Sequence, residues 1–271
     1  MFSRVSSSSR LGKREYNELR SLKVTYDIYS YTQGSVLFEI GNTKILCSVT
    51  LQNSVPHFLR GKRKGWLTAE YALLPAATPI RTVREVSANK RNGRTIEISR
   101  LIGRALRSVA NLSVLGENTI FIDCDVLQAD GGTRTACITA AYLALKCAQQ
   151  RLINDGTISG LLLTDEIASV SVGMGAYGPL VDMDFAEDST VHADYNFIIT
   201  RVGNRIVEIQ GSAEYAPISW SDFEDLKNLS LKAATDIFAF YDKNGYNIAN
   251  VEKKPLQQMY MPSYKDAMDY I

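Results

Sequence analysis

The chain is predicted to be an α+β protein whose helices pack on mixed sheets. Three observations predict this class: a β-hairpin pattern near the N-terminus, two helical patterns in the middle, and further strand patterns before a last helix. With 271 residues, 45% of them hydrophobic and 22% charged, the chain has the size and composition of a globular protein. No Pro-, Gly- or Ser-rich linker divides it, so residues 14–244 are predicted to form a single domain.

Strand patterns open the folded part. Residues 22–31 are strand-like, and residues 36–40 and 44–49 flank the turn Gly41-Asn42-Thr43 as a hairpin would. Residues 53–92 then form a polar stretch with three prolines and many cations. We expect a long loop there, of the kind that usually carries function.

Two helices are predicted next. The first presents one apolar face, made by Ile98, Leu101, Ile102, Ala105, Leu106 and Val109. Its arginines 100, 104 and 107 occupy the other faces, where we expect them to be solvated or paired. A strand over residues 118–127 leads to the second helix, which is predicted to begin near Thr133.

The C-terminal part repeats the pattern of strands followed by a helix. Strands are predicted at residues 168–174, 181–185, 196–201 and 205–210, and Ser221 and Glu224 fit a capping box for the last helix. Residues 1–13 are Ser-rich and basic without an apolar segment, which indicates a disordered tail. Residues 245–271 show no period and are treated as a C-terminal extension of unknown role.

Composition narrows the classes of function. Four cysteines without a C-x-x-C pair indicate buried thiols in a reducing cytoplasm. Two histidines, His57 and His192, leave little material for a His-rich zinc site or a Ser-His-Asp triad. No apolar run approaches the roughly 18 residues of a membrane span, so no membrane partner is expected.

The strongest functional signal is the run 128–135, which joins the strand to the second predicted helix. Gly131 and Gly132 let the backbone approach a ligand closely, and a helix start offers unpaired N–H groups and a positive dipole end. Thr133 and Arg134 add a hydroxyl and a guanidinium fork. This combination predicts a phosphate site, and the alternative is a tight turn with a Thr cap and a surface Arg.

Charge is unevenly distributed along the chain. Residues 60–107 contain 12 Lys or Arg and three acids, a net charge of +9 in a chain whose total is +1. Such a block suggests a surface that binds a polyanion, and the alternative is a set of solvated charges.

An acidic stretch follows later, with five acids and no Lys or Arg between residues 182 and 194. Asp182 and Asp184 alternate with apolar residues, which favours the water-facing side of a strand. Asp188 and Asp194 flank residues 189–193 and can converge. Two such carboxylates either hold Mg²⁺ or supply a proton to a leaving oxygen.

Taken together, several motifs closely resemble the ribonuclease PH family. The resemblance covers about residues 14–244. The motifs that carry it are RGK…GWLTAEY (60–71), NGRTIEISRLIGRALR (92–107), DCDVLQADGGTRT (123–135), EDS…DYN (187–196) and EIQGSAE (208–214).

The resemblance implies a fold of two similar β-α-β-α halves that share one core. It implies a phosphorolytic 3′→5′ exoribonuclease, a tRNA nucleotidyltransferase, that trims precursor tRNA and other RNA such as rRNA. Inorganic phosphate is then the co-substrate, nucleoside diphosphates are released, and the reaction is reversible. Family members assemble as a trimer of dimers, so a homohexamer in the cytoplasm is expected.

By motif, the resemblance assigns phosphate binding to Arg94, Gly132, Thr133 and Arg134. Asp188 and Asp194 would position Mg²⁺, or one of them would protonate the leaving 3′ oxygen; the sequence does not divide these two roles. Because phosphate is already a nucleophile, no Ser or Cys is required, and catalysis is mainly alignment and charge neutralisation.

The family's RNA-binding loop corresponds to residues 74–85, where Arg81 and Arg84 match cationic positions. Ala76 stands where the family usually has another Arg, and Lys62, Arg63 and Lys64 are candidates to replace that contact. A second departure is Leu11-Gly12-Lys13, where the family shows Pro-Asp-Gly.

Two other functions compete with the enzyme. A catalytically silent ring subunit, as in the RNA exosome, typically lacks the phosphate-binding Arg/Thr set or the acidic pair. This chain has both, as Arg94, Thr133, Arg134, Asp188 and Asp194. A polynucleotide phosphorylase would need a duplicated core and appended RNA-binding domains, which 271 residues cannot hold. The enzyme is therefore favoured.

Overall fold

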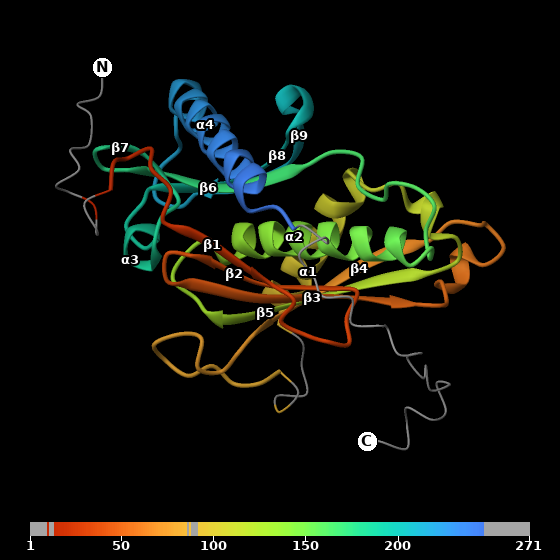
Figure 1. The fold of residues 1–271 in the computed structure, drawn as a ribbon. Helices are drawn as coiled ribbons and strands as arrows, with labels where there is room; N and C mark the ends of the chain where they lie inside the picture. The colour runs from red at the N-terminus through yellow and green to blue at the C-terminus, as the bar shows by residue number, and fades with distance from the viewer. Residues whose placement is uncertain (1–9, 11–13, 86, 88–91, 247–271) are drawn as a thin grey trace.

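The protein is built in four layers (Figure 1). The computed structural model describes residues 10, 14–85, 87 and 92–246. One long helix covers the outer face of a four-stranded sheet, two helices lie beneath that sheet, and a five-stranded sheet forms the opposite side. The predicted α+β class, with a sheet and helices in each half, is confirmed.

The five-stranded sheet contains the predicted hairpin and continues beyond it. Its strand order is β1-β2-β3-β5-β4, in which only the pair β4 and β5 is parallel among the described strands. The strands are β1 (Leu22–Tyr26), β2 (Gly34–Ile40), β3 (Thr43–Gln52), β4 (Trp66–Leu73) and β5 (Thr119–Gln128). The first strand ends earlier than predicted, because Asp27 turns the chain with a φ of 62°.

The long loop predicted over residues 53–92 is wrong in its middle. It contains a short 3₁₀ helix, His57–Leu59, and the edge strand β4. Leu67, Ala69 and Tyr71 are buried in alternation with more accessible neighbours, which is the period of a half-buried strand. Flanking cations and prolines hide that short alternation in the sequence. Residues 86 and 88–91 lie outside the described part of the chain.

Two helices pack between the sheets, α1 (Gly93–Ser108) and α2 (Thr133–Asn154). The side chain of Asn92 accepts a hydrogen bond of 3.1 Å from the Arg94 N–H and so fixes the start of α1. α2 begins at Thr133, as predicted, and is buried almost all round because both sheets contact it. β4 and β5 are parallel, so both strands end at the same edge of the sheet. The start of α2, which follows β5, therefore lies at the same edge as the loop that follows β4.

The second sheet is antiparallel, in the order β7-β6-β8-β9. Its strands are β6 (Ile167–Gly175), β7 (Gly178–Val181), β8 (Ala193–Thr200) and β9 (Ile206–Ala213), and α4 (Trp220–Asn244) covers it. A short 3₁₀ helix, Val202–Asn204, joins β8 to β9, and another, Leu112–Leu115, precedes β5. The capping box of α4 uses Ser219 and Asp222 rather than Ser221 and Glu224.

One predicted strand needs correction, and one described residue in each predicted tail is bound to the fold. The strand over 181–185 ends at Val181, after which Asp182 adopts a φ of 48° and a one-turn helix, α3 (Phe185–Asp188), begins. Arg10, expected in a disordered tail, is 5% exposed and bound to the fold. Tyr246, expected in the C-terminal extension, is buried and packs on Tyr26 with a ring distance of 5.2 Å.

All four cysteines are free and buried, as expected. Within the residues that the structure describes, every helix is too short or too polar to cross a bilayer.

Candidate active site

The predicted phosphate site is the turn from β5 into α2. Gly131 and Gly132 have φ values of 74° and 63°, a conformation that glycine adopts without strain. Gly132 is the N-cap of α2, and no described side chain caps this helix start. Thr133 therefore does not cap this helix, and the turn presents backbone N–H groups at the positive end of a 22-residue helix.

Gly131 also permits a close approach between this turn and the segment before α3. A Cβ at this position would lie 2.3 Å from the carbonyl oxygen of Met183 and 2.7 Å from the carbonyl carbon of Asp184. The Asp130 carboxylate accepts a 3.2 Å hydrogen bond from the Phe185 N–H, which is the first N–H of α3. The phosphate turn and α3 are therefore held together by direct packing and a hydrogen bond.

Three further groups surround the start of α2. Tyr71, near the end of β4, is 4% exposed, and burial raises its pKa, while interactions with Thr133 and Arg94 act in the opposite direction. Thr133 is 8% exposed, and Arg94 lies in the first turn of α1. Two helix starts and the end of β4 thus converge on one place. Tyr71 belongs to a motif that carries the family resemblance, but sequence reasoning assigned it no role.

Arg134 carries a guanidinium with an incomplete set of partners. Its Nη2 donates to Glu97 Oε2 at 3.1 Å, while its Nε is buried without a hydrogen-bond partner among the described residues. A buried donor without an acceptor costs about 1–3 kcal/mol. An anion placed at the start of α2 would supply an acceptor close to this guanidinium.

The two predicted catalytic carboxylates come from neighbouring elements. Asp188 ends α3, and Asp194 is the second residue of β8. Partial removal from water raises the pKa of Asp188, and the charges of Asp194 and Glu214 raise it further. Arg134 and Arg94 act in the opposite direction, so both cations and both acids share one electrostatic environment. Glu214 also lies in a motif of the family resemblance, and sequence reasoning assigned it no role.

Asp182 and Asp184 are not on the water-facing side of a strand, contrary to the prediction from their alternation. They are 4% and 8% exposed. Asp182 accepts hydrogen bonds of 2.6 and 3.0 Å from the guanidinium of Arg20, and Asp184 caps α3 in a capping box with Glu187. The chain leaves the sheet after Val181, so Asp182 and Asp184 are not part of a strand and their alternation with apolar residues does not define two faces.

Asp188 and Asp194 are the carboxylates that could hold Mg²⁺ together with oxygens of the substrate. No group of three or more His, Cys, Asp or Glu among the described residues is arranged to hold a metal. Mg²⁺ is, however, commonly bound by one or two carboxylates, with waters and substrate phosphate oxygens completing the octahedron. Burial raises the pKa of Asp188 first and the charge of Asp194 raises it further; a cation between the two carboxylates would offset that second contribution.

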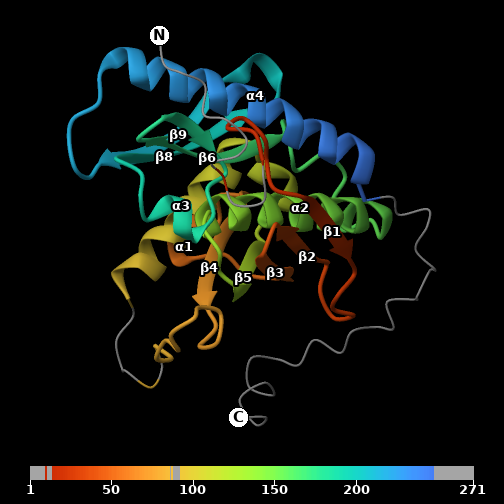
Figure 2. The same ribbon diagram turned by 90° about the vertical axis from the view of Figure 1, so that its left-hand side faces the viewer.

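The predicted RNA-binding residues fall into two separate groups. Lys62, Arg63, Arg81 and Arg84 are all exposed. The first two precede β4 and the last two follow it, so the eight-residue strand, about 26 Å long, separates the pairs. Figure 2 turns the side with α3 and the loop after β4 toward the viewer. Lys62 and Arg63 therefore lie at the opposite end of β4 from Ala76, the position where the family usually has an RNA-binding Arg.

The loop of residues 74–85 is tied to the phosphate turn. The Ala129 N–H donates to the carbonyl oxygen of Ala77 at 2.8 Å, and the hydroxyl of Thr95 donates to the Glu85 carboxylate. Arg81 and Arg84 therefore stand on a loop that is connected both to the start of α2 and to the start of α1.

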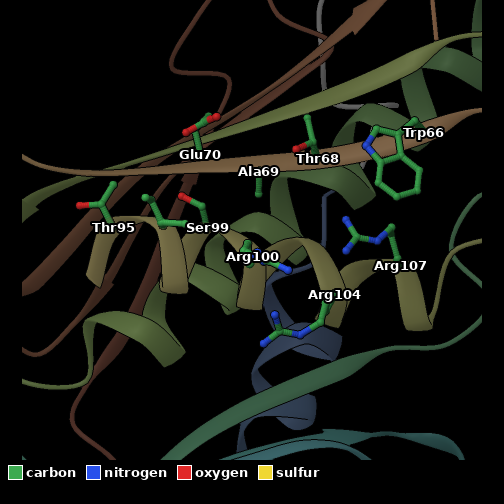
Figure 3. A pocket seen from close by; sticks show the side chains of 10 residues that line it. Trp66, Thr68, Ala69, Glu70, Thr95, Ser99, Arg100, Arg104 and Arg107 are labelled. Carbon is green, nitrogen blue, oxygen red and sulfur yellow. The ribbon is translucent and has the colours of Figure 1, made fainter. Parts of the chain in front are cut away.

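A groove of about 370 Å³ lies between β4 and α1 (Figure 3). As expected, two of its three arginines are paired. Arg104 forms a 2.6 Å ion pair with Glu208, and Arg107 lies 4.7 Å from the Trp66 ring centroid while donating to the Leu67 carbonyl oxygen. Arg100 is exposed at the rim of this groove.

Comparison with known proteins gives consistent matches. Residues 18–150 match the family model described as "3′ exoribonuclease family, domain 1". The chain is 48% identical to a protein named Ribonuclease PH from Bacillus pumilus, covering 84% of this chain and 94% of that protein. It is 50% identical to Ribonuclease PH from Bacillus subtilis, covering 83% and 91% respectively.

Solved structures share the fold at lower identity. One is the Archaeoglobus fulgidus exosome with RNA bound to its active site, with a TM-score of 0.72, 22% identity and coverage of 86% of this chain and 92% of that chain. Another is rice (Oryza sativa) Rrp46, with a TM-score of 0.70, 18% identity and coverage of 86% and 98%.

Proposed function

The chain belongs to the ribonuclease PH family, and on that basis we propose that it is a phosphate-dependent 3′→5′ exoribonuclease that trims the 3′ ends of precursor tRNA. One observation carries the proposal most directly. The helix start with the incompletely partnered Arg134 lies in the same electrostatic environment as Asp188 and Asp194. A nucleophilic phosphate and the acidic pair would therefore meet at one phosphodiester bond.

The proposed reaction needs no covalent intermediate with the enzyme. An oxygen of inorganic phosphate attacks the terminal phosphodiester phosphorus, and the bond from that phosphorus to the 3′ oxygen of the preceding nucleotide breaks. The last nucleotide leaves as a nucleoside diphosphate. Arg94, Arg134 and the N–H groups at the start of α2 hold the phosphate and stabilise the charge that develops.

The leaving 3′ oxygen must gain a proton, and we assign its donation to Asp188. The raised pKa of this carboxyl keeps it protonated to a higher pH than an ordinary aspartate. Asp194 is then the carboxylate that would hold Mg²⁺, because a protonated Asp188 is a poor ligand for a cation. Mg²⁺ bound there would neutralise charge on the reacting phosphate oxygens.

The partners follow from the same proposal. Arg81 and Arg84 would contact the phosphates of the RNA body, and RNA other than precursor tRNA, rRNA included, would enter with a free 3′ end. We expect a homohexamer, a trimer of dimers. The buried free cysteines support a reducing compartment such as the cytoplasm.

The experiment is to incubate the protein with a precursor tRNA that has an extended 3′ end, with and without inorganic phosphate and Mg²⁺. We expect shortened RNA and nucleoside diphosphates only when both are present. Nucleoside monophosphates released without phosphate would contradict the mechanism. A folded protein that binds the RNA and releases nothing would instead support the silent ring subunit.

A further inference from the structure

The helix that carries Asp188 cannot hold its position alone. α3 has four residues, none of them buried, and one turn of helix is unstable in water without outside contacts. Its N-terminus is fixed by the capping box of Asp184 and Glu187 and by the contact from Phe185 to Asp130. Glu187, which closes the capping box and directly precedes Asp188, receives a further contact from outside the helix.

That contact comes from Arg10, far away in the sequence. Arg10 Nε donates to Glu187 Oε1 and Nη2 donates to Glu187 Oε2, both at 2.8 Å, so the pair is bidentate. The remaining N–H groups donate to the carbonyl oxygens of Glu15, Tyr16 and Val181 at 2.9, 3.3 and 2.8 Å. All five N–H groups of this guanidinium are thus used, and its side chain is 2% exposed.

A second and a third arginine extend the network. Arg14 Nη2 donates to Glu187 Oε2 at 3.2 Å, and Arg20 binds Asp182 through both side-chain oxygens. Arg20 also donates to the carbonyl oxygen of Asp130 in the phosphate turn. Arg10 and Arg14 therefore bind the helix that carries Asp188, and Arg20 binds the turn that would hold phosphate.

We propose that Arg10 is a positioning residue: by holding Glu187 it fixes α3, and so fixes the carboxyl of Asp188 against the phosphate turn. This inference rests on the proposed function. Arg10 would touch neither RNA nor phosphate, and it would act only through Glu187. A lysine could not replace it, because an ammonium group cannot make the same planar bidentate pair while donating to three carbonyl oxygens.

The test is Arg10→Lys, which keeps the charge and loses the fork. We expect kcat for phosphorolysis to fall on the order of 10- to 100-fold, since a small misplacement of a reacting group has such a cost. The KM for phosphate should stay unchanged, because Arg94 and Arg134 are on other elements. Arg151→Lys is the control: the Arg151 side chain is 23% exposed and pairs with Asp27 at 2.5 Å, outside this network, so kcat should not change.

Each outcome decides between the two proposals. A wild-type protein that releases no diphosphate would contradict the proposed function and, with it, a role for Arg10 in phosphorolysis. An active wild type with a folded Arg10→Lys variant of unchanged kcat would overturn the positioning role alone, as would an equal loss in kcat and in phosphate affinity.

If Arg10→Lys does not fold, Glu187→Gln provides the second variant, because it keeps the shape and the capping oxygen. The same selective loss in kcat is expected. Unfolding of both variants would show that the pair supports the whole domain, which would overturn a specific role for α3.

Discussion

Two groups of charges lie side by side in this protein and are organised in opposite ways. In the first, Arg10 and Arg14 surround Glu187; burial acts to raise the pKa of Glu187, but the bonds and charge of Arg10 lower it below its ordinary value. In the second, Asp188 faces Asp194 and Glu214, and its pKa is raised. Two consecutive acids therefore titrate in opposite directions, one completely paired and the other among like charges.

The opposite pKa directions of Glu187 and Asp188 distinguish a structural carboxylate from a proposed catalytic one. A bidentate carboxylate with a lowered pKa is stable and unreactive, and its value is in holding α3. A crowded carboxylate and a buried guanidinium N–H without an acceptor are costly unless a ligand completes them. The second group is thus where phosphate, Mg²⁺ and RNA are expected, and the first is its support.

The largest expected effect is that of Asp188→Asn. Removing the proposed proton donor should lower kcat on the order of 10²- to 10⁴-fold. The same substitution should increase stability at neutral pH. The raised pKa of Asp188 means that ionising this carboxyl destabilises the folded state; the destabilisation begins as pH rises above the ordinary value of 3.8 and is complete above the raised pKa. Thermal unfolding should show a higher Tm than wild type at pH 7 and an equal Tm near pH 3. A lower Tm at pH 7 would contradict burial and like charge as the causes of the raised pKa.

Arg134→Ala should abolish phosphate-dependent release, with a loss of roughly 10²- to 10³-fold, while fold and RNA affinity remain. The measurement is initial rate against phosphate concentration. Glu97→Gln is the control, because it removes the ion pair of Arg134 and leaves the proposed phosphate ligand in place. Wild-type rates in Arg134→Ala would remove this residue from the phosphate site.

Glu187→Gln should destabilise the fold by about 1–3 kcal/mol at pH 7, since Arg10 loses its charged partner. The lowered pKa gives Glu187 a contribution that is present above its ordinary value of 4.5 and lost as pH falls through the folded value. Urea unfolding at pH 7 and near pH 3 should therefore show a difference between the variant and wild type that shrinks in acid. A difference that grows in acid would show that the sign is wrong.

The loop after β4 should give the smallest effect. Replacing Arg81 and Arg84 together with Ala should weaken RNA binding and make the slope of log K against log salt shallower by about 1.5. Lys62→Ala with Arg63→Ala tests the opposite end of β4 on the same RNA. An unchanged slope for the first pair would show that the loop does not contact phosphates.

The local part of this site was predictable because one continuous run encodes it. The strand, the two glycines and the helix that begins at Thr133 are adjacent in sequence, so their chemistry can be deduced without a fold. The hairpin was predictable for the same reason. The strand β4 was missed, since an alternation of a few residues is masked by the cations and prolines around it.

The supporting network could not be predicted from local pattern. Arg10 and Glu187 are 177 residues apart, and Arg20 and Asp182 are 162 apart. The alternation in the acidic stretch predicted a strand with Asp182 and Asp184 on its water-facing side. Both residues are buried instead, because Arg20 pairs with Asp182 and an N–H group of α3 donates to Asp184. A buried ion pair has no sequence period, so only the fold brings its partners together.

The most direct test of the proposed mechanism is to follow the phosphate itself. RNA should be incubated with the protein, Mg²⁺ and ³²P-labelled inorganic phosphate, and the released nucleotides separated. We predict that nucleoside diphosphates carry the label in the β position in wild type, and that Arg134→Ala releases almost none. Unlabelled nucleoside monophosphates, or label incorporated equally by Arg134→Ala, would contradict the claim that the start of α2 delivers the attacking phosphate.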